Sequence, residues 1–235
     1  SHASEATIVR TCKKLGYQGY YHLKIALAKE VINPDNSYPD NTDFTDITSL
    51  ATFLLKKQAE DLIQSTQFFN AEVLESILKL LANCDTIFFF AAGNSNPLAV
   101  YSAYKFSQLG LKTVVHVSPE MQINAAYSMG KRDLAIGISN SGSTNLMVDI
   151  FKVVKERGAK SVCITNYIKS PLSKLSTHQL NTAVSDKIFF EAFDSTRVPA
   201  MGVIDMLVLL FMYKNKAHYE KYRTREEFLG SRFKG

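Results

Sequence analysis

The chain has 235 residues, of which 46% are hydrophobic, and carries a formal net charge of +5. This composition excludes a disordered or fibrous chain, and the length predicts one large domain, or one medium domain with a small additional piece. The positive charge is concentrated in residues 1–32 and from Lys214 onward, whereas the middle is slightly acidic. We therefore expect an end of the chain, and not its body, to meet a polyanion.

Neither a membrane segment nor a metal site is indicated by the sequence. No apolar run reaches the roughly 18 residues of a membrane span, and the first residues lack the regions of a signal peptide. We therefore expect a cytoplasmic protein without a membrane partner. Cys12, Cys84 and Cys163 are widely spaced in apolar surroundings, which predicts reduced core thiols. The histidines are scattered at spacings that suggest no metal site, and no cofactor is expected.

The first 32 residues predict a pair of short helices. Ser4 is a suitable N-cap for a helix over 5–15, Gly16 would end it, and a second helix is expected over about 20–32. The polar side of the first helix carries Thr7, Arg10, Lys13 and Lys14. Two interpretations remain open at this point: a solvated basic helix pair packed on the main domain, or the end of a helix-turn-helix unit that enters the DNA major groove.

A linker over residues 33–45, with two prolines and several turn formers, marks the expected domain boundary, so the main domain is predicted over 46–235. Two helical patterns follow, over about 46–69 and 70–82. From Thr86 the pattern alternates between strands, at 86–92, 113–117, 133–139, 161–166 and near 179–184, and helices, at 97–109, 121–128, 144–157, after Ser170 and at 198–214. This alternation predicts an α/β fold with a doubly wound parallel sheet.

Two polar loops follow strands of this predicted sheet. Parallel strands bind ligands at their carboxyl ends, where the strand order reverses. After the first strand, Gly93 permits close backbone approach, and Asn94 and Ser95 offer hydrogen bonds. The third strand is followed without a spacer by Ser139, Asn140, Ser141, Gly142, Ser143 and Thr144, and then by a helix.

A strand, a small-residue loop and a helix start together favour phosphate binding. Such a junction aims backbone N–H groups and the positive end of the helix dipole at one point, and four hydroxyl groups add donors there. The alternative is an ordinary connection, since Ser, Asn and Gly are common turn and N-cap residues. The loop matches neither the Walker A nor the Gly-x-Gly-x-x-Gly pattern, so a small phosphorylated molecule is favoured over a nucleotide.

The N-terminal run, residues 4–20 (SEATIVRTCKKLGYQGY) followed by 23–28 (LKIALA), closely resembles the end of the DNA-binding domain of RpiR-type transcriptional regulators. The family pattern is Ser-x-x-Thr, two apolar residues, Arg-x-Cys, two basic residues, Leu-Gly and an aromatic residue. The resemblance implies a helix-turn-helix domain over 1–32, with DNA-contacting residues Ser4, Thr7, Arg10, Lys13 and Lys14. In that family further helices precede this run, so the chain looks like a fragment.

The same resemblance implies that the main domain is a flavodoxin-like SIS domain that holds a phosphosugar between its two loops, with the phosphate nearest Ser139, Ser141 and Thr144. The segments 163–166 and 170–172 also match the family. Glu191 to Arg197 resembles the stretch where SIS domains place a glutamate near the sugar, although a surface ion pair between Glu191 and Arg197 explains these residues equally well. Around Glu120 the chain lacks the Asp and His that the family often carries, which leaves the identity of the sugar open.

Two functions follow from these patterns. The first is a transcriptional regulator of sugar or amino-sugar metabolism that binds operator DNA as a homo-oligomer and responds to a phosphorylated sugar. The alternative is a sugar-phosphate isomerase or related SIS enzyme with Glu191 or Glu120 as general base. The basic helix face near the N-terminus favours the regulator, because an isomerase gains nothing from it.

Overall fold

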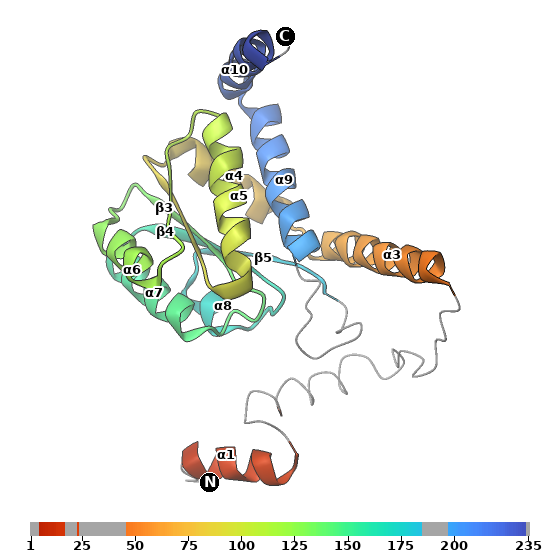
Figure 1. Ribbon diagram of the computed structural model, residues 1–235. Helices are drawn as coiled ribbons and strands as arrows, with labels where there is room; N and C mark the ends of the chain where they lie inside the picture. Colours follow the sequence, from red (N-terminus) through yellow and green to blue (C-terminus); the bar gives the residue numbers. More distant parts are fainter. Residues whose placement is uncertain (1–4, 17–22, 24–45, 185–196, 234–235) are drawn as a thin grey trace. The chain divides into compact units, whose positions relative to one another are not determined.

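The computed structural model describes residues 5–16, 23, 46–184 and 197–233 (Figure 1). The chain divides into two compact units, residues 1–50 and 51–235, which we treat separately. Ser4, Glu191 and the predicted linker over 33–45 lie outside the described residues, as does the predicted second helix apart from Leu23.

The first unit contains helix α1, Glu5–Lys14. The backbone N–H of Leu15 donates to the carbonyl of Thr11 at 3.1 Å, and Gly16 follows with φ +87°. Because a left-handed residue ends a helix and glycine adopts this conformation without steric cost, the predicted end of the helix at Gly16 is confirmed.

The second unit is built on a sheet of five parallel strands in the order β2-β1-β3-β4-β5. Its strands are β1 Ile87–Ala91, β2 Thr113–Val115, β3 Leu134–Ile138, β4 Lys160–Thr165 and β5 His178–Asn181. Every residue of β1 and β3 is buried, which explains why these segments read as continuous apolar runs. The predicted parallel sheet is confirmed.

Helices cover both faces of this sheet (Figure 1). Side chains of β1 alternate between two cores: Ile87 and Phe89 pack on one face, Phe88 and Phe90 on the other. The first core is completed by α4 Ala71–Asn83, α5 Asn96–Gln108 and α9 Arg197–Lys214, and the second by α6 Pro119–Ser128, α7 Asn145–Glu156 and α8 Pro171–Leu175. Because the helix after β1 and the helix after β2 lie on opposite faces, the sheet is doubly wound, as predicted.

Helix α3, Ile47–Ser65, is followed by a short 3₁₀ turn, Thr66–Phe68. The Oγ atom of Ser65 accepts a hydrogen bond of 2.9 Å from the N–H of Ala183, and Leu62 packs so closely on Gly202 of α9 that a side chain there would overlap it. These contacts attach the end of α3 to the sheet unit. The predicted cap of α4 is confirmed, since Asn70 Oδ1 accepts from the N–H of Val73 at 3.1 Å.

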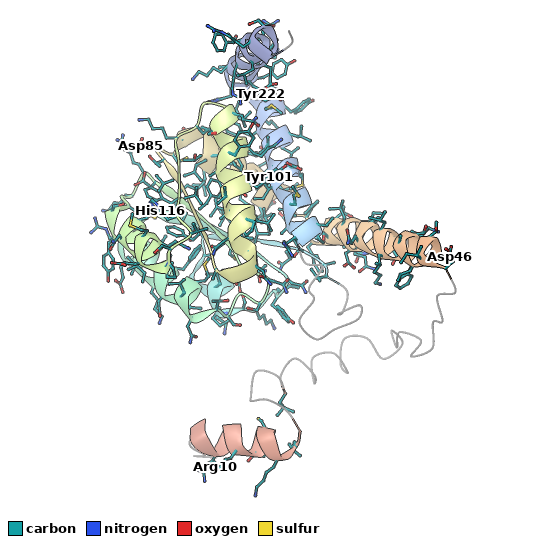
Figure 2. The ribbon with its side chains drawn as sticks, viewed as in Figure 1. Arg10, Asp46, Asp85, Tyr101, His116 and Tyr222 are labelled. Carbon is teal, nitrogen blue, oxygen red and sulfur yellow. The ribbon has the colours of Figure 1, made fainter. Side chains whose placement is uncertain are left out.

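A polar contact joins α5 to α9 within the first core. The hydroxyl of Tyr101 donates to Asp205 Oδ1 at 2.6 Å, and Figure 2 shows Tyr101 between these two helices. Burial, and second the bond to Asp205, raise the pKa of Tyr101 to about 12. Tyr101 therefore stays neutral and acts as a hydrogen-bond donor.

Helix α10, Lys216–Phe233, was not predicted. Its sequence lacks a regular apolar stripe, so periodicity gives no signal. Surface ion pairs from Arg223 to Glu220 and Glu227 support it, and His218 attaches it to the body, with Nδ1 2.7 Å from the carbonyl oxygen of Leu109. Among the described helices none alone has the length and hydropathy to cross a membrane; α9 and α10 meet those criteria only when joined, and they are bent by 109° at their junction.

Candidate functional site

The two polar loops meet at the carboxyl edge of the sheet. Ala91 and Ile138, the last residues of β1 and β3, are partners in the strand register, so the loops that follow them leave the sheet side by side. The chain passes from β1 to β2 on one side and continues from β3 to β4 on the other. Since strand order reverses here, the topology places this edge where doubly wound sheets bind ligands.

The β3 loop is anchored through its backbone acceptors. The carbonyl of Asn140 accepts hydrogen bonds from the N–H of Asn166 at 2.9 Å and from Thr165 Oγ1 at 3.0 Å. The carbonyl of Gly142 accepts from the N–H of Leu172 in α8, also at 2.9 Å. Because the β4–α8 segment already donates to these two carbonyl groups, the loop can interact with a ligand mainly through its hydroxyl and N–H donors.

Gly142 makes this anchoring possible. It has φ +58°, in the left-handed region that disfavours side chains. A Cβ atom at this position would overlap Ser170 Oγ and would lie 2.9 Å from Thr165 Oγ1. The sequence indicated Gly142 only as a loop residue, whereas the structure shows that glycine is required both by the conformation and by the close approach of Ser170.

The serines of the loop divide into internal and available hydroxyls. Ser139 is 95% buried, and its Oγ accepts a hydrogen bond of 3.2 Å from the N–H of Gly142, which closes the turn. Ser141 Oγ accepts from the N–H of Ser143 at 3.3 Å and from Ser143 Oγ at 3.1 Å. These bonds leave the hydroxyl hydrogen of Ser141 to donate to a ligand.

The helices that follow β1, β2 and β3 begin without a side-chain cap. Their N-cap residues are Ser95, Ser118 and Thr144, and none of these side chains makes a capping hydrogen bond. By contrast, Ser170 caps α8 by accepting from the N–H of Ser173 at 3.1 Å. Because an uncapped helix start favours an anion or an oxygen ligand, α7 and α5 are suited to receive one.

Asn96 is a candidate that our sequence analysis did not single out. It lies in the first turn of α5, directly after Gly93, Asn94 and Ser95. Its Oδ1 atom is buried and has no hydrogen-bond partner among the described residues. A buried acceptor without a donor is unfavourable by about 1–3 kcal/mol, so a donating hydroxyl of a ligand would stabilise it. No sequence pattern distinguishes this amide from an ordinary loop asparagine.

Gln122 is a second residue that sequence reasoning missed. It is buried at the start of α6, where its Nε2 donates to the carbonyl of Ala91 at 2.8 Å and its Oε1 accepts from the N–H of Ala91 at 3.2 Å. Strand β2 ends at Val115, opposite Phe89, and therefore does not pair with Ala91. The Gln122 amide replaces the missing strand and fixes the point from which the β1 loop departs.

Three other residues singled out in the sequence are also described by the structure. Arg197 is the first residue of α9 and is exposed, and Glu120 is exposed in the first turn of α6. Cys163 lies on β4, and its burial raises the pKa of the thiol to about 11, so it is a neutral core residue, as predicted. The described residues contain no group of three or more His, Cys, Asp and Glu side chains that could hold a metal ion.

On α1 the predicted DNA-contacting residues share one face where the structure describes them. Thr7, Arg10 and Lys14 are exposed and are spaced three and four positions apart, which places them on the same side of a helix. Cys12, on the opposite side, is buried. The side chain of Lys13 lies outside the described residues. This segment therefore presents a polar, basic face and buries Cys12 on the other side.

Comparison with known proteins identifies both parts of the chain. Residues 80–210 match the SIS domain, and residues 1–34 match the helix-turn-helix domain of the rpiR family. A helix-turn-helix type transcriptional regulator of Caldanaerobacter subterraneus subsp. tengcongensis is 31% identical over 224 residues, which cover 93% of this chain and 78% of that relative.

Two solved structures share the fold. NanR of Vibrio vulnificus, solved in complex with ManNAc-6P, has a TM-score of 0.76 at 24% sequence identity. The match covers 97% of this chain and 81% of the NanR chain. The sugar isomerase domain of an RpiR transcription factor from Sphaerobacter thermophilus has a TM-score of 0.68 at 19% sequence identity. That match covers 76% of this chain and 98% of the Sphaerobacter chain.

These matches agree with the resemblance of the N-terminal run and with the doubly wound sheet. They also decide between the two functions, since the curated relative with 31% identity is a regulator and the chain carries the helix-turn-helix segment. Its SIS domain is a regulatory ligand-binding domain and not an isomerase. The chain therefore belongs to the RpiR family of helix-turn-helix transcriptional regulators, with a SIS domain after the DNA-binding segment.

Proposed function

We propose that this regulator controls sugar or amino-sugar metabolism in the cytoplasm and that its SIS domain binds a phosphorylated sugar as effector. The β3 loop carries the proposal, because it joins an uncapped helix start to donor hydroxyls at the edge where the strand order reverses. The solved complex of NanR with ManNAc-6P supports it, since that protein shares the fold and binds an amino-sugar phosphate.

The proposal assigns the phosphate to Ser141 and Thr144 and to the first N–H groups of α7, and Ser143, whose hydroxyl donates to Ser141 Oγ, would orient the Ser141 hydroxyl toward it. Ser139, as the acceptor that closes the turn, and Asn140, which anchors it, would hold these donors in place with Gly142. The sugar would lie toward the β1 loop, where Gly93 allows close approach and Asn94, Ser95 and Asn96 offer polar groups. Glu191 and Arg197 complete the proposed site.

Titration with matched ligands tests this function. We expect a phosphorylated sugar or amino sugar to bind and to raise the melting temperature, because charge-assisted bonds to the phosphate contribute about 1.5–3 kcal/mol each. The dephosphorylated sugar should bind at least about tenfold more weakly. Thermal-shift screening over a panel of such pairs, followed by calorimetry, gives the comparison. Equal affinity within each pair would show that the loop is only a turn.

Operator DNA is the second proposed partner. The domain boundaries proposed for this role are 1–32 for the DNA-binding segment, 33–45 for the linker and 46–235 for the SIS domain. The residues proposed to contact phosphates and base edges are Ser4, which precedes α1, and Thr7, Arg10, Lys13 and Lys14 of α1. The exposed basic face formed by Thr7, Arg10 and Lys14 supports this assignment.

We further propose that the chain functions as a homo-oligomer, and helix α3 supports this. Ala51, Leu55, Ala59 and Ile63 recur every four residues, so they form one apolar stripe, and all are exposed. Leu55 is 68% and Ile63 is 67% exposed. Such a stripe on a long helix favours packing against its copy in a second chain, as in symmetric dimers.

Replacing Leu55 and Ile63 by Glu should therefore dissociate the oligomer, because two buried carboxylates at a symmetric interface would repel one another. Light scattering at micromolar concentration should show a dimer or larger assembly for the wild type and a monomer for the double variant. The control is Gln64→Glu, a neighbouring exposed position outside the stripe. A monomeric wild type, or an unchanged assembly in the double variant, would contradict this proposal.

A further inference from the structure

A cavity of about 300 Å³ opens at the amino-terminal edge of the sheet, opposite to the loops that follow β1 and β3. It is lined by the end of α7, the start of β4, and the end of α8 with the residues that lead from it to β5. Each of these three segments contributes one lysine to the lining: Lys155, Lys160 and Lys174. The cavity is therefore separate from the proposed effector site.

The charge of this cavity is uncompensated. No Asp or Glu is among its lining residues, and Lys155, Lys160 and Lys174 form no ion pair within the described part of the chain. The alkyl chain of Lys131 lies against Gly158, which lines the cavity, with Cγ 3.2 Å from where a Cβ would stand. A fourth lysine thus adjoins the rim. Like charges gathered around a concave surface raise the local potential and attract anions.

Two hydroxyl groups add donors to this charge. The N–H of Ser161 donates to Thr177 Oγ1 at 3.1 Å, and the N–H of Thr177 donates to Ser161 Oγ at 3.2 Å. Both oxygens act as acceptors in this reciprocal pair, so both hydroxyl hydrogens remain to donate. Because Ser161 and Thr177 line the cavity, their hydroxyls and the lysines together form a set of donors.

Helix dipoles explain only part of this arrangement. Lys155 and Lys174 lie in the last turns of α7 and α8, where a cation stabilises the negative end of the helix. Lys160 begins a strand and has no such role. Lys160 also acts on a neighbouring side chain: the pKa of His178 is lowered first by burial and second by the positive charge of Lys160. Stabilisation of helix ends therefore does not explain why all three lysines line one cavity.

We propose that this cavity binds a small molecule that carries at least two phosphate groups. Three ammonium groups and two hydroxyl donors match the charge and the many acceptor oxygens of such a ligand, and lysine is a common phosphate binder. The volume lies at the lower end of small-molecule sites, about 300–1,000 Å³. Duplex DNA is the weaker candidate, because it is recognised across extended surfaces of about 1,000 Å² or more.

Calorimetric titration with inorganic tripolyphosphate tests the site in the whole chain. Lys160→Glu with Lys174→Glu should weaken binding by at least about tenfold, because each change replaces an attraction by a repulsion. The charge-matched control is Lys79→Glu with Lys216→Glu, two exposed lysines on α4 and α10 that do not line the cavity. This control and Ser141→Ala, in the proposed effector site, should each stay within about threefold of the wild type.

Five results would overturn the proposal. The wild type could fail to bind tripolyphosphate, or the two charge-matched double variants could lose affinity equally, which would indicate only the overall charge. A loss in Ser141→Ala would place the anion at the β3 loop. Citrate could bind as tightly as tripolyphosphate. Finally, the binding of non-cognate duplex DNA, and not that of tripolyphosphate, could depend on Lys160 and Lys174. Either of these last two results would exclude a small polyphosphate as the ligand. Because the variants are at surface positions, melting temperatures should confirm that all remain folded.

Discussion

Replacing Ser141 by Asp should abolish sugar-phosphate binding while leaving the fold intact. The carboxylate would stand where a hydroxyl donates to the phosphate, and two like charges about 4 Å apart at a protein surface repel by about 4 kcal/mol. We therefore expect affinity to fall by at least about a hundredfold. Ser141→Ala, which removes only the donor, should weaken binding about tenfold. Calorimetry with the best ligand from the panel measures both.

The control for this pair is Ser107→Asp, the same chemical change at an exposed position of α5. It should leave the affinity within about twofold of the wild type, because exposed charges this far from a site are screened. Melting temperatures of all three variants should lie close to that of the wild type, as expected for polar positions outside the hydrophobic core. An Asp variant that binds as tightly as Ser141→Ala would show that no phosphate lies beside this residue.

Replacing Gly142 by Ala should cost both stability and ligand binding. The left-handed φ of Gly142 disfavours a side chain by about 1–2 kcal/mol, and the new methyl group would overlap Ser170 and press on Thr165. Relieving that overlap moves the β3 loop from the β4–α8 segment that anchors it, at a further cost of about 1–3 kcal/mol. Denaturant unfolding should show the sum, and titration should show loss of sugar-phosphate binding.

Gly93→Ala separates the two contributions to this effect. Gly93 also has a positive φ, +55°, but a Cβ atom there would have no neighbour within 4 Å. This variant should therefore lose only the conformational part of the stability. Equal destabilisation of the two variants would mean that the contact with Ser170 and Thr165 does not restrict the loop.

The fold could be predicted from the sequence wherever burial or a helix cap leaves a recognisable local pattern. β1 and β3 are buried on both faces and appear as unbroken apolar runs. Asn70 begins a helix through its side-chain cap, and Gly16 ends one through its left-handed conformation. Helix α10 could not be predicted, because its surface is polar nearly all round and its contacts with the body join distant segments: His218 to Leu109, Lys221 beside Gly110, and Tyr222 on the first core. Such long-range contacts leave no periodic pattern in the local sequence.

The candidate site divides in the same way. Its position followed from topology, since the strand order alone brings the β1 and β3 loops together. The roles of its side chains did not follow. Whether Ser139 points inward as an acceptor, whether Asn96 keeps an unpaired oxygen, and whether Gln122 bonds Ala91 depend on contacts between distant segments. Residue type cannot reveal these contacts.

The pairing of β1 with β3 also sets when the site forms as the chain folds. Ala91 and Ile138 are partners although α5, β2 and α6 separate them in sequence. Closing so long a connection costs chain entropy before any contact compensates for it, which makes such pairings slow. The two loops have no common surface until this step is complete. A ligand held by both loops therefore selects fully folded molecules and adds its binding free energy to their stability.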